Sequence, residues 1–99
     1  MHVVDEDPGA GEAVSLHRRH IDRIDRTIVA LLAERMRLGL ALGAIKREHG
    51  WPTRSFAREA EVLALVRAAV AGPLSEASVE RIFTAIIEET AARQEDGRG

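Results

Sequence analysis

The sequence predicts an all-α fold with three helices per chain, one of them very long. Residues 13–49 contain no proline and are rich in Ala, Leu, Arg and Ile, most of which are good helix formers. Gly50 with Pro52, and later Gly72 with Pro73, stand where helices are expected to end. No segment alternates apolar and polar residues as a half-buried strand does. At 99 residues, the chain is expected to form one helical domain.

The three helices are expected at about 13–49, 55–71 and 75–94. We expect Ser75 to be the N-cap of the third, because its hydroxyl can accept from an unpaired N–H of the first turn. Residues 1–12 are acidic and contain Gly and Pro, which predicts a disordered leader. Residues 13–95 then form the helical domain, and residues 96–99 a disordered tail.

The first helix is too long for a chain of this size. About 37 residues at 1.5 Å each span roughly 55 Å, whereas a compact chain of about 100 residues is only about 35 Å across. Apolar residues recur along nearly the whole helix at spacings of three and four: Val14, Ile21, Ile24, Ile28, Leu31, Leu38, Leu42 and Ile45. We call these eight residues the apolar stripe. Two short helices cannot cover it, so the sequence predicts a homodimer with twofold symmetry.

The composition argues against several classes of protein. The chain has no cysteine, which excludes disulfides and thiolate metal sites. A net charge of -2 and an aromatic content of 3% argue against nucleic acid as a partner. No apolar run approaches the roughly 18 residues that span a membrane, and the N-terminus lacks the apolar region of a secretory signal. A cytoplasmic location is therefore expected. His17 and His20 are attributed to a solvated basic face, so no metal site is expected.

Polar residues interrupt the apolar face of the first helix. Arg35 lies within the apolar stripe, and a buried guanidinium needs an anion. Lys46, the only lysine, lies eleven residues further and within about 20° of the same face. Gly39 and Gly43 lie between these two cations and could leave space for a ligand. Alternatively, the glycines allow another helix to pack closely, and Arg35 pairs with a structural glutamate.

The second and third helices carry similar interruptions. Glu59 stands where the apolar face of the second helix should continue, and Arg58 adds a cation beside it. A simpler explanation is that Glu59 favours a helix N-terminus. Thr90 and Gln94 continue the apolar face of the third helix. The alternative for these two residues is a helix end that leaves the core.

These residues resemble the helical chorismate mutase family. The resemblance rests on three groups of motifs in order, which are Ile21–Asp25 with Leu31–Arg35 and Gly43–Lys46, then Arg58–Leu63, then Phe83–Glu88 with Thr90 and Gln94. Each motif alone is weak, but their order and separation over about residues 14–94 are specific. The resemblance implies an intertwined homodimeric helical bundle. It also implies an isomerase without cofactor that converts chorismate to prephenate in aromatic amino acid biosynthesis.

The same resemblance assigns four residues to the two carboxylates of the substrate. Arg35 would grip one carboxylate, and Arg18 would reach the site of the partner subunit. Arg18 lies roughly 25 Å along the helix from Arg35, so the two cannot easily share a site within one chain. Arg58 and the hydroxyl of Thr90 would help to hold a carboxylate.

The remaining assignments concern the ether oxygen and the ring. Lys46 and Gln94 would donate hydrogen bonds to the ether oxygen whose bond breaks, and Glu59 would accept from the ring C4 hydroxyl. Ser55 departs from the family, which often has Asp at this position near the C4 substituent. Two alternative substrates therefore stay open. An amino-substituted chorismate would make the chain a 4-amino-4-deoxychorismate mutase, and isochorismate would make it an isochorismate-pyruvate lyase. A non-catalytic helical dimerisation module is the other alternative, but it leaves Arg35, Glu59 and Gln94 without a reason.

Overall fold

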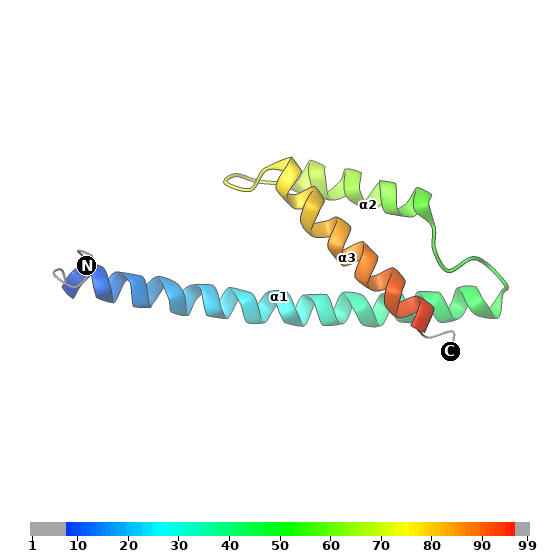
Figure 1. Cartoon of the computed structure of the whole chain (residues 1–99), viewed down its shortest axis with the longest axis horizontal. Helices are drawn as coiled ribbons and strands as arrows, with labels where there is room; N and C mark the ends of the chain where they lie inside the picture. The colour runs from blue at the N-terminus through cyan, green and yellow to red at the C-terminus, as the bar shows by residue number, and fades with distance from the viewer. Residues whose placement is uncertain (1–7, 97–99) are drawn as a thin grey trace. The chain divides into compact units, whose positions relative to one another are not determined.

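The computed structural model describes residues 8–96, which form three helices. They are α1 (Pro8–Glu48), α2 (Phe56–Ala69) and α3 (Glu76–Asp96), labelled in Figure 1. Within these residues there is no β-strand. The prediction of an all-α fold with one very long helix is confirmed. The expected leader falls outside the described residues over 1–7, as does the expected tail over 97–99.

Helix α1 is 41 residues long and begins at Pro8 rather than near Ala13. Residues 8–12, which the sequence assigned to the leader, are therefore helical. Proline is well suited to the first helical position, because the N–H that it lacks would have no partner within the helix. The Gly and Pro content of this segment predicts disorder, but in the structure Pro8 is the first residue of the helix.

The C-terminus of α1 is a Schellman motif centred on Gly50. This glycine has a φ of 70°, which residues with a side chain rarely adopt. Its N–H donates to the carbonyl of Arg47 at 3.1 Å, and the N–H of Trp51 donates to the carbonyl of Lys46 at 2.8 Å. The two bonds satisfy carbonyls that the end of a helix leaves unpaired. The predicted helix stop at Gly50 is confirmed.

Serine hydroxyls begin both shorter helices. The Ser55 side chain accepts from the N–H of Arg58 at 3.2 Å, and the Ser75 hydroxyl accepts from the N–H of Ser78 at 3.0 Å. The predicted N-cap role of Ser75 is confirmed. Ser55 has the same role, so the residue at which the sequence departs from the family is the N-cap of α2.

The chain divides into two units with the boundary inside α1, between Arg35 and Met36. The described part of the first unit is the helix over residues 8–35. The second unit holds the rest of α1, the loop 49–55, α2 and α3. Helices α2 and α3 pack against each other, as Figure 1 shows, and Arg67 pairs with Glu80 between them at 3.1 Å. Val79 and Ile87 are the only hydrophobic residues of the described chain that are buried.

The apolar stripe of α1 is exposed in the single chain. All eight of its residues are at least 40% exposed, and Leu38 reaches 67%. Burial of apolar surface is the main favourable term in folding and association, and a large exposed apolar patch usually marks an interaction surface. The prediction that one chain cannot cover this stripe is confirmed. Over residues 8–96, no helix is long and apolar enough to cross a membrane.

The Schellman glycine gives a first test. Gly50→Ala should destabilise the protein by about 1–2 kcal/mol, because alanine must adopt a left-handed conformation there. Gly11→Ala is the matched control, since a Cβ at Gly11 meets nothing within 4 Å and its backbone has no positive φ. This control should be neutral, or more stable by up to about 1 kcal/mol. Urea unfolding at one fixed protein concentration measures both changes. Equal stability of the two variants would contradict the assignment of this helix end.

Candidate functional site

The C-terminal part of α1 carries a glycine face against which the end of α3 packs. A Cβ at Gly39 would lie 2.8 Å from Cγ2 of Thr90, and a Cβ at Gly43 would lie 3.2 Å from Cγ of Gln94. Both distances are shorter than an ordinary carbon contact. The sequence left two explanations for this glycine pair, which were space for a ligand and close packing of a helix. The structure contains the close packing, because the side chains of Thr90 and Gln94 occupy the space.

Gln94 is a buried polar residue that hydrogen bonds across the packed helices. It is 8% exposed, and its Nε2 donates to the carbonyl oxygen of Gly39 at 2.7 Å. The alternative that Gln94 belongs to a solvated helix end is therefore wrong. A side-chain amide has two N–H donors, so the bond to Gly39 occupies one and leaves one. Because a carbonyl can only accept, this contact also fixes which way the amide faces.

Lys46 lies on the same face of α1 and is tied to the following loop. Its Nζ donates to the carbonyl of Thr53 at 3.2 Å, and Thr53 is itself buried. Gly39 and Lys46 are seven residues apart, so they lie within about 20° of each other around the helix. An ammonium group has three donors, and the contact with Thr53 uses one of them. The structure thus brings Lys46 and the Gln94 amide to one face of α1.

Arg54, in the loop before α2, forms an ionic cluster with Glu59 and Glu88. Its Nε donates to Oε2 of Glu59 at 2.8 Å and its Nη2 to Oε1 at 3.1 Å. Nη2 also donates to Glu88 of α3 at 2.8 Å. The hydrogen bond to Glu59, followed by that to Glu88, raises the pKa of Arg54 above its already high ordinary value. The guanidinium carbon lies 4.6 Å from the centre of the Phe56 ring.

Arg54 is a site residue that the sequence pattern does not predict. Loop residues have no helical period against which an interruption can be noticed, so spacing gave no signal. The one available hint was the chain's preference for arginine, which provides 13 of its 14 basic side chains and which grips carboxylates with two nitrogens. Glu59 is consequently more than a favourable charge at a helix N-terminus, because both of its oxygens are held by one guanidinium.

The other predicted residues of the second unit make local contacts. Arg58 pairs with Glu61 at 3.1 Å, and both side chains are more than 60% exposed. The Thr90 hydroxyl donates to the carbonyl of Ile86 at 2.9 Å. To donate to a substrate carboxylate, this hydroxyl must first turn its hydrogen away from Ile86. The Ser55 hydroxyl is engaged as the N-cap of α2.

A cavity of about 230 Å³ lies where the loop before α2 meets the end of α3. It is lined by Thr53, Arg54, Glu88, Ala91, Ala92, Gln94 and Glu95. The cavity thus brings the buried amide and the ionic cluster together. Its volume lies below the roughly 300–1,000 Å³ of most small-molecule sites. A site built on this cavity in one chain alone would be small.

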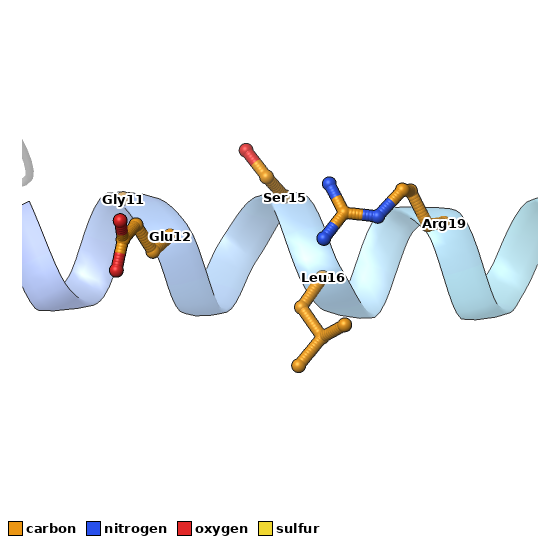
Figure 2. Close-up of a pocket in the computed structure, with 5 residues that line it drawn as sticks. All are labelled: Gly11, Glu12, Ser15, Leu16 and Arg19. Carbon is orange, nitrogen blue, oxygen red and sulfur yellow. The ribbon is translucent and has the colours of Figure 1, made fainter.

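A second hollow lies on the first unit, and Figure 2 shows the residues that line it. These are Gly11, Glu12, Ser15, Leu16 and Arg19. The side chains in Figure 2 project from a single helix, so this hollow is a surface groove without a second wall. It contains none of the predicted site residues. Arg18 is exposed and Arg35 half-buried in this same unit, and their place in the site stays a prediction. Over residues 8–96, no group of three or more His, Cys, Asp or Glu side chains could hold a metal ion.

Comparison with known proteins identifies related chains. The family model for chorismate mutase type II matches residues 17–95. A chorismate mutase structure from Thermus thermophilus, form II, has 31% sequence identity and a TM-score of 0.82, over 84% of this chain and 94% of that one. Form I of the Thermus enzyme has 32% identity and a TM-score of 0.77, over 79% of this chain and 98% of that one. Among curated protein sequences, none matches significantly.

The glycine face gives a second test. Gly39→Ala should press its new methyl group against Cγ2 of Thr90, and overpacking of this kind typically costs about 1–3 kcal/mol. Thr90→Ser removes that methyl group and should relieve the clash. The two substitutions should therefore show a favourable coupling of about 1 kcal/mol or more in a double-mutant cycle of unfolding free energies. Additive effects would mean that α3 does not pack on Gly39 in solution.

Proposed function

The chain belongs to the chorismate mutase type II family and acts as an isomerase on chorismate, and we propose that two copies build each active site. Within that site, the chain holds the substrate by its carboxylates and stabilises the ether oxygen as its bond breaks. The observation that carries this proposal is the buried Gln94 amide, fixed by Gly39 on the face of α1 that also bears Lys46.

The rearrangement of chorismate to prephenate is a Claisen reaction within one molecule. The enolpyruvyl arm folds over the ring, a C–C bond forms, and the C–O bond to the ether oxygen breaks. The step needs no nucleophile and no proton transfer. Catalysis can therefore come from holding the folded conformation and from donors aimed at the oxygen on which negative charge develops. Such donors act because they stabilise the transition state more than the ground state.

Lys46 and Gln94 are suited to the ether oxygen. Each is anchored by a backbone carbonyl, Lys46 by Thr53 and Gln94 by Gly39. Each keeps at least one further N–H donor. Anchored donors need little reorganisation when charge appears, which is the condition for electrostatic catalysis. They are also the only lysine and the only glutamine of the chain.

The carboxylates of the substrate are assigned to the arginines. We propose that Arg35 and Arg58 grip them with the help of the Thr90 hydroxyl, and that Arg18 arrives from the partner subunit. The pair that Arg58 makes with Glu61 is exposed, and exposed pairs of this kind are weak. Arg58 can therefore leave Glu61 for a substrate carboxylate at little cost.

The homodimer is supported by what the single chain leaves exposed. The apolar stripe runs along α1, and every one of its residues is at least 40% exposed. A second copy carries the same stripe and satisfies the twofold symmetry of a self-complementary interface. The small size of the cavity beside Gln94 also agrees with a site that a second chain completes.

The substrate assignment depends on the ring-facing residues. Glu59 would accept from the C4 hydroxyl, and Ser55 places no charge beside it. This arrangement favours chorismate over the amino-substituted analogue of a 4-amino-4-deoxychorismate mutase. Purified protein should consume chorismate and yield prephenate as the identified product. Formation of pyruvate from isochorismate, or turnover of the amino analogue alone, would assign the chain to one of the other two reactions. The cytoplasmic location stays a prediction.

Complementation tests the shared site. Arg18→Ala and Arg35→Ala should each be nearly inactive as homodimers, because each site lacks one arginine. After subunit exchange, a heterodimer has one site with both arginines and one site with neither. Mixtures of the two variants should therefore regain a measurable part of the parent activity. Sedimentation should give about twice the chain mass of 10.8 kDa for the parent and for both variants. Absence of recovery after verified exchange, or an active monomer, would contradict the shared site.

The ether-oxygen assignment predicts how Lys46 and Gln94 affect the kinetics. Lys46→Ala and Gln94→Ala should each lower kcat by roughly 10²–10³, or about 2.7–4 kcal/mol, because one preorganised donor is lost. The loss in kcat should exceed the rise in KM. Lys46→Ala should have the larger effect, since it also removes a charge that attracts the substrate.

Gln94→Glu tests whether Gln94 has a catalytic role in addition to its structural one. A carboxylate would repel the developing charge, so kcat should fall at neutral pH and recover partly as the pH is lowered and the carboxyl becomes protonated. The same carboxylate would face the carbonyl of Gly39, which Gln94 now contacts at 2.7 Å. Thermal unfolding must therefore be measured at each pH, and rates compared only where the variant is folded. A near-parent kcat with an unchanged pH profile would contradict the assignment of Gln94 to the ether oxygen.

A further inference from the structure

We propose that Arg54 is a positioning residue for Glu59, and that its guanidinium tunes this carboxylate to accept from a hydroxyl group rather than to bind an ammonium group. The inference rests on the proposed function, because only there does Glu59 face the ring substituent of the substrate. Arg54 itself need not touch the substrate. It would act through the orientation and the charge of the carboxylate that it holds.

The contact between Arg54 and Glu59 fixes the carboxylate in two ways. Two different nitrogens of Arg54 donate to the two different oxygens of Glu59, at 2.8 and 3.1 Å. A contact of this kind sets both the direction and the plane of the carboxylate. The Glu59 side chain is only 21% exposed, so water competes weakly for it. An ionised carboxylate has about four acceptor sites, and the two that Arg54 leaves can accept from a substrate hydroxyl.

The charge of Arg54 bears on the choice of substrate. A neutral hydroxyl needs only an acceptor, and the paired Glu59 still offers one. An ammonium group binds most strongly to a negative charge that no other cation compensates. A guanidinium within hydrogen-bond distance of that negative charge repels the ammonium group. The second carboxylate on Arg54 belongs to Glu88, which is 58% exposed and therefore well screened by water. The charges of Arg54 and Glu59 consequently almost cancel at the position of a buried ligand.

A purely structural role for Arg54 is the competing explanation. Through Glu88, Arg54 also ties the loop before α2 to helix α3, at 2.8 Å. If this tie were its whole function, breaking it from either end would have the same effect. Arg67 provides a matched control, because it links α2 to Glu80 of α3 at 3.1 Å and does not line the cavity that contains Gln94.

The experiment compares two substrates across four variants of the full chain. The variants are Arg54→Gln, Arg54→Lys, Glu88→Gln and Arg67→Gln. For each variant and for the parent, kcat and KM are measured with chorismate and with its 4-amino analogue, and folding is verified by thermal unfolding. Arg54→Gln should lower kcat/KM for chorismate by about tenfold to a hundredfold, since small misplacements of a positioning group cost that much. The loss in kcat/KM with the amino analogue should be smaller. The substrate ratio, which is kcat/KM for the amino analogue divided by kcat/KM for chorismate, should therefore rise about tenfold.

The remaining variants separate charge, geometry and tethering. Arg54→Lys keeps the charge but not the two-nitrogen contact, so the ratio should stay near that of the parent while chorismate turnover remains reduced. Glu88→Gln and Arg67→Gln should each leave the ratio within about twofold. Three results would overturn the inference. The first is that Arg54→Gln lowers kcat/KM equally for both substrates. The second is that Glu88→Gln changes the substrate ratio as much as Arg54→Gln does, and the third is that Arg54→Lys changes that ratio to the same extent. If the parent turns over neither substrate, the proposed function itself has failed. An active parent with an unchanged ratio in Arg54→Gln defeats only this inference.

Discussion

The hydrogen bond between the Gln94 amide and the Gly39 carbonyl, at 2.7 Å, is the contact on which the candidate site depends. It requires that α1 lack side chains at Gly39 and Gly43, because a Cβ at either position would press on α3. The missing side chains cost helix stability of about 1 kcal/mol each. In return, the polar end of α3 is held on the face of α1 that carries Lys46. The cavity beside Gln94 lies where this end of α3 meets the loop that contains Arg54.

A second constraint is that one chain leaves the apolar stripe of α1 uncovered. Only Val79 and Ile87 are buried among the hydrophobic residues of the described chain, while the apolar stripe of α1 lies exposed. Since apolar burial is the dominant stabilising term, we propose that fold and site are completed in one step, by a second copy. Arg18 and Arg35 of one chain would then serve two different sites of the dimer.

Much of this structure could be predicted because helix ends and apolar faces follow local rules. Gly50 and Ser75 marked helix boundaries by their backbone and capping properties, and Gln94 stood out because it broke an apolar face. Other features depend on tertiary contacts that a pattern cannot specify. A glycine pair is compatible with a ligand or with a neighbouring helix, and only the position of Thr90 and Gln94 decides between them. Arg54 lies in a loop without periodicity, so its contacts with Glu59 and Glu88 gave no signal in the sequence.

The most direct test observes Gln94 itself. The chain contains one glutamine and no asparagine, so nitrogen-15 NMR of the protein should show a single side-chain amide pair in a symmetric dimer. The hydrogen bonded to Gly39 should exchange slowly with water in the free protein. Saturation with a dicarboxylic mimic of the transition state should shift the other hydrogen strongly, because it then donates to the oxygen that stands for the ether oxygen. An amide pair that exchanges freely, or that does not move when the mimic is bound, would contradict the account.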